Sequence, residues 1–302
     1  MNSSCDHISV CVCTYERQRL LAELLNKLQD QVTNGLFSYS VAVVDNDHDQ
    51  SAKKVVESFN QQSSLSVKYY TEPEQNIALA RNKAVETAKG NFIAFIDDDE
   101  FPVKEWLLNL YKTCIQFNAD GVLGPVKPNF ESEPPKWIIE GKLHERASFK
   151  TGTRITNSRD ARTGNVLLSR RIFRDGVGPF DRKFGRTGGE DTDFFKRMMA
   201  KGYIFTWCDE AYVYEVVPPH RLKRVYFIKR ALLRGQVESR HVPFTSRSTF
   251  KSIMAVVLYT SVLPFLFLTK HYLFMKCLIK DCDHIGKLLG LCGLNIIKER
   301  AT

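Results

Sequence analysis

Short apolar runs alternate with amphipathic segments over the first half of the chain. The runs are rich in β-branched residues and are expected to form strands at Ile8–Cys13, Ser40–Val44, Ser66–Tyr70, Phe92–Ile96 and Gly121–Val126. The segments between them repeat apolar positions every three or four residues, which predicts helices that cover the faces of a sheet. This alternation is typical of βαβ units, so we predict an α/β fold with a doubly wound, mostly parallel sheet.

Polar residues gather where three of these predicted strands end. Thr14–Arg17 follow the first strand, Asp45–Asp47 follow the second, and Asp97–Glu100 follow the fourth. The carboxyl ends of parallel strands meet at one edge of a sheet, where open α/β folds bind their ligands. We therefore expect the three segments to line one crevice.

The pattern changes after residue 126. Lys127–Thr163 contains several prolines and little periodicity, and we predict a long loop that either shapes a substrate site or acts as a lid. After this loop we predict one helix, Glu190–Ala200. We also predict strands at Gly164–Ser169, Tyr203–Trp207 and Tyr212–Val217.

Positive charge is concentrated in the last part of the chain. The formal net charge is +9, and His220–Thr302 contains 15 Lys and Arg residues against 4 Asp and Glu residues. The preceding residues carry 28 basic and 30 acidic side chains. One end of the molecule is therefore expected to contact an anionic membrane surface or an acidic partner, and the near-neutral body argues against a nucleic-acid partner.

The same basic region contains an apolar stretch, Ser252–Thr269, without a formally charged side chain. As a helix it would extend about 27 Å, close to the hydrocarbon thickness of a bilayer. Basic residues flank it on both sides, which does not suit a crossing that keeps positive charge on one side only. We expect residues 221–302 to form helices that attach to the membrane as a peripheral or monotopic element.

The cysteines and the N-terminal residues indicate the compartment. Eight cysteines are scattered without a Cys-x-x-Cys pair, which favours a reducing cytosol over a disulfide framework. The first apolar run is interrupted by Thr14, Glu16 and Arg17, unlike a secretory signal. The expected location is the cytoplasmic face of the membrane, the inner membrane in a bacterium.

Three adjacent carboxylates, Asp97, Asp98 and Asp99, follow the apolar run Phe92–Ile96. Their mutual repulsion is relieved best by a divalent cation, and Mg²⁺ or Mn²⁺ suits hard oxygen ligands. Alternate residues converge more easily than neighbours, so Asp97 and Asp99 are the candidate metal ligands. A solvated acidic loop would explain an isolated triplet equally well, but its place at the predicted crevice favours a metal site.

Two glycines precede the acidic pair Glu190 and Asp191 at the start of a predicted helix. Carboxylates at a helix N-terminus stabilise it by capping and by the helix dipole, which is the structural explanation. Glycines also let the backbone pass close to a ligand. One of the two carboxylates would then lie at the edge of a pocket and accept a proton from a hydroxyl.

Five motifs in this order and spacing resemble those of family-two glycosyltransferases with the GT-A fold, in the branch similar to bacterial exopolysaccharide glycosyltransferases. They are Ile8–Arg17, Val43–Asn46, Asn76–Asn82, Ile93–Asp99 and Gly188–Asp191. The resemblance covers roughly residues 8–220. It implies an inverting transfer of a sugar from a nucleotide-diphosphate donor, with a UDP-sugar favoured, to a saccharide or lipid-linked acceptor in cell-surface polysaccharide or glycolipid synthesis.

The resemblance also implies roles for individual residues. Asp191 would be the catalytic base with Glu190 beside it, and Asp97, Asp98 and Asp99 would form the metal and sugar-nucleotide motif. The remaining donor-binding residues would be Thr14, Glu16, Arg17, Asp45, Asn46 and Arg81. His220 lies where some GT-A enzymes place another metal ligand, although a surface histidine explains it as well. Trp137 would be the candidate to stack on an acceptor sugar.

These expectations divide the chain into a catalytic domain at 1–220 and a membrane-associating region at 221–302. Two other functions remain open from the residues alone: a sugar-nucleotide-binding protein without activity, and a pyrophosphorylase-like nucleotidyltransferase. The chain contains neither G-x-G-x-x-G after its first strand nor G-x-x-x-x-G-K-[ST], so dinucleotide-binding and P-loop functions lack their phosphate cradle.

Overall fold

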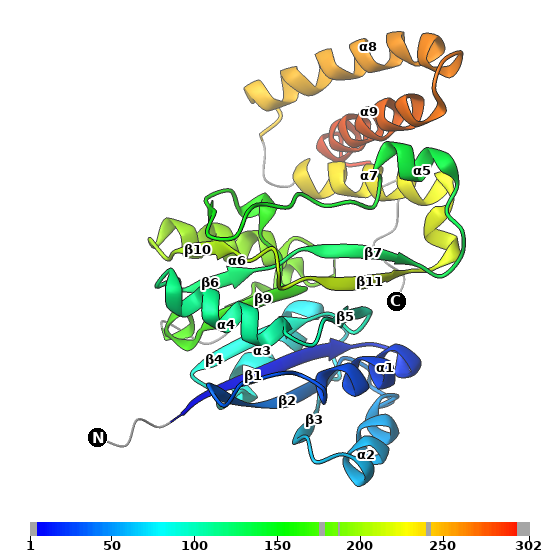
Figure 1. Cartoon of the computed structure of the whole chain (residues 1–302). Helices are drawn as coiled ribbons and strands as arrows, with labels where there is room; N and C mark the ends of the chain where they lie inside the picture. The colour runs from blue at the N-terminus through cyan, green and yellow to red at the C-terminus, as the bar shows by residue number, and fades with distance from the viewer. Residues whose placement is uncertain (1–4, 175–178, 187, 240–242, 295–302) are drawn as a thin grey trace. The chain divides into compact units, whose positions relative to one another are not determined.

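The computed structural model describes residues 5–174, 179–186, 188–239 and 243–294 (Figure 1). The chain divides into two compact units. The first unit comprises Met1–Lys127 and Arg146–Glu215, and the second comprises Pro128–Glu145 and Val216–Thr302. The functional division at residue 220 stays a prediction.

An eight-stranded sheet forms the centre of the first unit. Its strand order is β3-β2-β1-β4-β9-β6-β10-β8. In chain order these strands are β1 (Asp6–Thr14), β2 (Phe37–Asp45), β3 (Val67–Thr71), β4 (Phe92–Ile96), β6 (Gly121–Leu123), β8 (Arg154–Ile155), β9 (Asn165–Ser169) and β10 (Phe205–Trp207). Strand β1 pairs in parallel with β2 and β4, whereas β9 runs antiparallel between β4 and β6. The predicted α/β fold with a mostly parallel sheet is confirmed.

Helices and two apolar clusters accompany this sheet. The helices are α1 (Gln18–Leu28), α2 (Lys53–Gln62), α3 (Ile77–Thr87), α4 (Trp106–Gln116) and α6 (Glu190–Ala200). Residues Ile8, Val10 and Val12 of β1 join one buried cluster, and the alternate residue Cys11 joins the other. Because successive strand residues point to opposite faces, this run is covered on both sides.

A smaller sheet and short helices replace much of the predicted loop at 127–163. The smaller sheet has the order β5-β11-β7, from β5 (Glu100–Pro102), β11 (Val213–Val217) and β7 (Val126–Phe130). Within this segment helix α5 spans Lys136–Gly141 and a 3-10 helix spans Ser158–Asp160. Further 3-10 helices lie outside it, at Arg170–Phe173, Arg182–Phe184 and Pro219–Leu222. The prediction of one long loop is therefore wrong. Strand β7 has five residues and helix α5 has six. Elements this short do not show a detectable repeat of apolar positions in the sequence.

The second unit is helical, with α7 (Arg224–Ser239), α8 (Arg247–Phe267) and α9 (His271–Leu291). Helices α7 and α9 cross closely at Gly286. A Cβ on this glycine would lie only 2.2 Å from the carbonyl oxygen of Leu232. Trp137 of α5 packs edge-on against Phe227 and His271. Its aromatic face is thus engaged in packing within this unit, which weakens its candidacy as an acceptor-stacking residue.

Helix α8 is long and apolar enough to cross a membrane by its length and composition. Its 18-residue apolar window has a mean hydropathy of 1.8 and is only 6% buried. The predicted apolar stretch is therefore confirmed as one exposed helix. Most apolar segments of the first unit, by contrast, belong to its buried core.

Candidate active site

The turn after β4 brings together residues from two strand ends. Thr14, the last residue of β1, donates its hydroxyl proton to Asp98 Oδ2 at 2.8 Å. The guanidinium of Arg17 donates from one nitrogen to Asp98 Oδ1 at 2.7 Å and to Asp99 Oδ2 at 2.9 Å. Glu16 between them has a left-handed backbone, with φ of 51°, and its side chain is exposed. The sharp bend at Glu16 lets the chain turn back so that Arg17 reaches the acidic turn.

In this arrangement the surroundings of Asp98 have opposing effects on its pKa. Burial raises the pKa of the Asp98 carboxyl to about 6, and Asp99 adds to the rise while Arg17 and Thr14 oppose it. For Arg17, burial alone would lower the pKa, but the charges of Asp98 and Asp99 outweigh it and raise the pKa. Arg17 therefore stays protonated beside the triplet and neutralises part of its charge.

Arg81 forms a second ion pair at this edge of the sheet. It lies on α3, whose first turn is capped by the Asn76 side chain through bonds from the backbone N–H groups of Ala78 and Leu79. The Arg81 guanidinium contacts the carboxylate of Glu190, and its second nitrogen lies 3.4 Å from Asp97 Oδ1. One arginine thus joins the acidic turn to the first residue of α6.

Both members of the Arg81–Glu190 pair are buried. Burial raises the pKa of Glu190, and Arg81 only partly opposes that rise. For Arg81, burial would lower the pKa, but Glu190, Asp97 and Asp191 outweigh it and raise the pKa. The carboxylate of Glu190 is therefore occupied by Arg81 and is poorly placed to accept a proton from an incoming molecule.

Asp191 is the more accessible carboxylate of the acidic pair. It is half-buried, whereas Glu190 is 5% exposed. Its Oδ1 accepts a bond from the backbone N–H of Thr192 at 2.7 Å. Gly188 and Gly189 precede the helix with φ of 80° and 99°, a backbone that favours glycine. Within the pair, Glu190 contacts Arg81 and Asp191 is the more exposed carboxylate, and proton transfer by Asp191 stays a prediction.

The predicted donor-binding residues Asp45 and Asn46 have internal partners. Asp45 Oδ2 accepts bonds from the Ala52 N–H and the Tyr69 hydroxyl, each at 2.8 Å, and burial raises the pKa of Asp45. The Asn46 amide donates to the carbonyl oxygens of Glu72 and Glu74, at 2.9 and 2.6 Å. These bonds shape the loop after β2, and contact of either side chain with a nucleotide stays a prediction.

The acidic turn could supply some of the oxygen ligands of a divalent cation, but not a complete set. Among the residues that the structure describes, no group of three His, Cys, Asp or Glu side chains is arranged to hold a metal by itself. Asp97 and Asp99 supply hard carboxylate oxygens, and the Asp97 side chain is 43% exposed. Mg²⁺ and related ions are commonly held by one or two carboxylates together with phosphate oxygens of the substrate. His220 is exposed in the second unit, and its role as a ligand stays a prediction.

Sequence patterns did not single out Glu100 as a buried residue. It begins β5, its side chain is 1% exposed, and burial raises its pKa well above the usual range, with Asp97 adding to the rise. Arg146 pairs with Glu215 on β11 and lies 3.8 Å from Glu100 Oε1. A run of four acidic residues looks solvent-exposed in sequence, but Asp98, Asp99 and Glu100 are all buried in the fold, where β5 pairs with β11.

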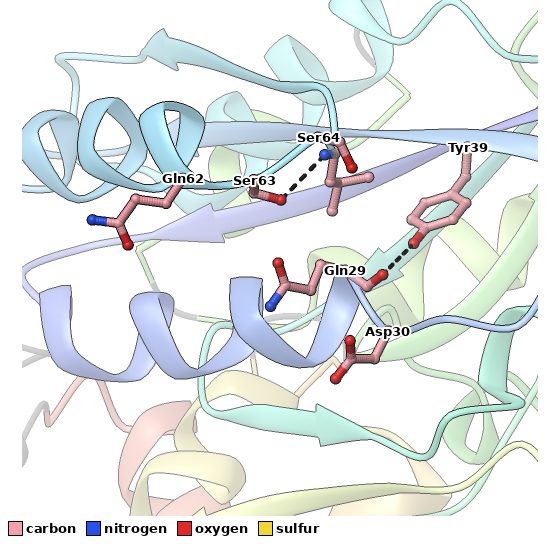
Figure 2. A pocket seen from close by; sticks show the side chains of 7 residues that line it. Gln29, Asp30, Tyr39, Gln62, Ser63 and Ser64 are labelled. Carbon is pink, nitrogen blue, oxygen red and sulfur yellow. Dashed lines mark hydrogen bonds between the residues drawn. The ribbon is translucent and has the colours of Figure 1, made fainter.

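A polar pocket lies elsewhere on the first unit (Figure 2). It is lined by Gln29, Asp30, Tyr39, Gln62, Ser63, Ser64 and Leu65. The Tyr39 hydroxyl donates to the carbonyl oxygen of Leu28 at 2.7 Å, and the Leu65 N–H donates to Ser63 Oγ at 3.1 Å. None of the predicted site residues lines it, so it is separate from the acidic turn.

The chain is similar in sequence to known proteins. The family model described as glycosyl transferase family 2 matches residues 9–177. The succinoglycan biosynthesis protein ExoM of Rhizobium meliloti (strain 1021) is 35% identical over 238 residues, which is 78% of this chain and 74% of that protein. The chondroitin synthase of Escherichia coli is 26% identical over 279 residues, but this chain spans only 40% of its length.

Solved structures show the same fold. A mannosyltransferase from Pyrobaculum calidifontis, in complex with GDP-Man and Mn²⁺, aligns with a TM-score of 0.64 at 17% identity, over 95% of this chain and 88% of that one. Staphylococcus aureus TarS 1-349 in complex with UDP-GlcNAc aligns with a TM-score of 0.56 at 18% identity, over 96% and 93%.

The mostly parallel sheet, with an acidic turn after β4 and an acidic pair opening α6, has the GT-A-type fold. With the family match and the similarity to ExoM, the chain belongs to glycosyl transferase family 2. The predicted resemblance is confirmed.

Proposed function

We propose that the chain transfers a sugar, with inversion, from a nucleoside-diphosphate donor to a saccharide acceptor carried on a lipid. The observation that supports this proposal most directly is that Arg81 contacts both Asp97 and Glu190, the first residue of α6. Arg81 thereby connects Asp97 of the acidic turn with Glu190, the neighbour of the candidate base Asp191. The similarity to ExoM and to chondroitin synthase supports a role in the synthesis of a cell-surface polysaccharide or glycolipid.

Binding of the donor is assigned to the acidic turn and its two arginines. Arg17 and Arg81 carry positive charge beside the triplet and would interact with the diphosphate. Asp99 and Asp97 would hold Mg²⁺ or Mn²⁺ together with diphosphate oxygens. When bound, such a cation would supply positive charge to stabilise the nucleoside diphosphate as a leaving group. The complexes of the two aligned structures with UDP-GlcNAc and with GDP-Man and Mn²⁺ support this class of donor, and we favour a UDP-sugar.

The transfer step is assigned to Asp191. The acceptor hydroxyl attacks the anomeric carbon and loses its proton to the Asp191 carboxylate. The bond between that carbon and the diphosphate oxygen breaks, and the electron pair leaves with the nucleoside diphosphate. Because there is one displacement, the configuration at the anomeric carbon is inverted. Glu190 keeps Arg81 oriented and takes no proton in this scheme.

Membrane attachment is assigned to α8. Large apolar side chains are exposed along it, including Phe250, Val257, Leu258, Phe265 and Phe267. Its polar residues contact α9 instead: Thr260 donates to Asp281 at 3.0 Å, and Ser252 bonds to His284 at 3.2 Å. A helix with one polar side on protein and the other side apolar suits in-plane attachment at the cytoplasmic face, where a lipid-linked acceptor is available.

The proposal is tested with purified protein, a panel of UDP- and GDP-sugars, and lipid-linked saccharide acceptors. We expect a nucleoside diphosphate to be released in step with transfer, inverted configuration in the product by NMR, and loss of transfer on chelation that Mn²⁺ or Mg²⁺ restores. Use of a nucleoside triphosphate would indicate a pyrophosphorylase, and full activity after exhaustive chelation would contradict the metal requirement.

A further inference from the structure

Glu100 is a buried carboxylate that has no role in the proposed transfer scheme. It follows the acidic triplet directly, and its residue is 1% exposed. On the small sheet it lies opposite Glu215 of β11, so two acidic side chains face one another across an antiparallel pair. Burial of a carboxylate and opposition of like charges both destabilise the fold unless other contacts offset them.

Two bonds join Glu100 to Asp97 and close the acidic turn. The backbone N–H of Glu100 donates to the carbonyl oxygen of Asp97 at 3.1 Å. In the other direction, the backbone N–H of Asp97 donates to Glu100 Oε2 at 3.4 Å. The Glu100 side chain therefore fixes the backbone from which the Asp97 carboxylate projects toward Arg81.

Arg146 holds Glu100 from the other side. Its guanidinium pairs with Glu215 Oε2 and lies 3.8 Å from Glu100 Oε1. The charge of Arg146 compensates the two opposed glutamates and keeps the Glu100 carboxylate in its buried position. Arg146 was not among the predicted site residues, because it is distant from every motif in the sequence.

Gly164 leaves the space that this arrangement needs. A Cβ at that position would lie 2.7 Å from Glu100 Oε1 and 3.0 Å from Asp97 Oδ2. The two carboxylates thus converge on one bare backbone position. Glu100 Oε1 is buried and accepts no hydrogen bond from the described residues. The hydrogen bonds that Glu100 makes therefore do not fully compensate the cost of burying its carboxylate.

We propose that Glu100, held by Arg146, is a positioning residue that fixes Asp97 for binding of the donor diphosphate and its cation. This inference rests on the proposed function, because it assigns Glu100 to the same donor site. A residue that only stabilises the fold would change the melting temperature without a specific loss of nucleotide binding.

The chain offers a matched control in Asp120. Its carboxylate is also buried, pairs with Arg171, and accepts the backbone N–H of Ile204 at 2.8 Å. It thus shares the carboxylate, arginine and backbone N–H of the Glu100 arrangement, but none of these three residues belongs to the candidate active site. Asp120→Ala therefore measures the cost of losing such a contact away from the site.

The experiment measures the Kd of UDP, with GDP as a second probe, by calorimetry at saturating Mn²⁺, together with the Kd of Mn²⁺ at fixed nucleotide. For Glu100→Ala we expect both constants to rise about tenfold or more, the equivalent of about one charge-assisted hydrogen bond. Glu100→Gln keeps an oxygen for the Asp97 N–H, and its constants are expected to stay within about threefold of wild type. Asp120→Ala is expected to stay within about twofold while losing a similar amount of melting temperature.

Nucleotide and Mn²⁺ binding by Glu100→Ala that matches Asp120→Ala would overturn the positioning role. If Glu100→Ala does not fold, Glu100→Asp replaces it, because the shorter side chain withdraws the carboxylate from the Asp97 N–H and is expected to show the same loss. Failure of the wild-type protein to bind either nucleotide would instead contradict the proposed function, and the positioning role with it.

Discussion

The guanidinium of Arg81 contacts the carboxylate of Glu190, although the two residues are 109 positions apart in the chain. Both side chains are less than a tenth exposed. The contact joins helix α3 to the first turn of helix α6, and the other terminal nitrogen of Arg81 lies 3.4 Å from Asp97 Oδ1. Through Arg81, this buried pair connects Asp97 of the acidic turn with the helix that carries Asp191.

Removal of one partner of this pair is expected to destabilise the protein strongly. Glu190→Ala leaves the buried Arg81 charge with the 3.4 Å contact to Asp97, and the loss of the Glu190 partner costs about 3–5 kcal/mol. The double variant Arg81→Met/Glu190→Leu is expected to lose less, because no unpaired charge remains at this pair. Urea unfolding of the single and double variants measures the difference. A loss in the double variant as large as the sum of the two single losses would show that the pair contributes no specific coupling.

The pKa of Asp98 predicts how stability changes with pH. Its pKa of about 6 in the folded protein lies above the ordinary value of 3.8, so the native state binds the proton more tightly than the unfolded chain. Ionisation of Asp98 therefore removes stability as the pH rises from about 4 to about 6, by roughly 3 kcal/mol in total, and removes none above that range.

Comparison with Asp98→Asn isolates this effect. The free energy of unfolding of the variant, relative to wild type, is expected to increase between about pH 4 and pH 6 and then to stay level. Chemical denaturation at several pH values, without nucleotide or divalent cation, measures it. Parallel curves for the two proteins across this range would contradict the raised pKa.

The close crossing of α7 and α9 depends on glycine. A Cβ on Gly286 would lie 2.2 Å from the carbonyl oxygen of Leu232, and backbone atoms cannot move aside cheaply. Gly286→Ala is expected to destabilise the helical unit by about 1–3 kcal/mol despite the better helix propensity of alanine. Lys280→Ala, at an exposed position of the same helix, is the control and is expected to stay near wild type. A Gly286→Ala protein with unchanged thermal unfolding would contradict the close crossing.

Exposed apolar residues of α8 are expected to determine membrane binding. Leu258 and Phe265 are 61% and 72% exposed, and each contributes about 2 kcal/mol on transfer from water. Leu258→Glu or Phe265→Glu should therefore lower the partition coefficient onto anionic phosphatidylglycerol vesicles about tenfold or more. Ile115→Glu makes the same change at a 55% exposed position of α4 and should leave flotation unaltered. Equal flotation of all variants would exclude α8 as the attachment.

The strands that position the site were predictable, because their apolar runs are covered on both faces and stand out in sequence. Ile8–Cys13 lies within the observed β1, and the predicted Phe92–Ile96 is the observed β4. The acidic triplet was predictable for a related reason: polar residues that follow a buried parallel strand emerge at its carboxyl end. The bounds of the helix Glu190–Ala200 were also predicted as observed.

The contacts among these residues were not predictable from local patterns. Nothing in the neighbourhood of Glu190 indicates that it holds Arg81, and nothing near Arg146 indicates a contact with Glu100 and Glu215. These pairings join residues that are far apart in sequence, and they depend on how the strands and helices pack. Helix α5 was missed because six residues after two prolines carry too little periodicity.

The transfer activity of Asp191→Asn tests the central claim most directly. We expect this variant to fold, to bind nucleoside diphosphate and Mn²⁺ as wild type does, and to lose sugar transfer by about 10²-fold or more, because asparagine cannot take the acceptor proton. Transfer by Asp191→Asn at a rate near that of wild type would contradict the assignment of Asp191 as the base.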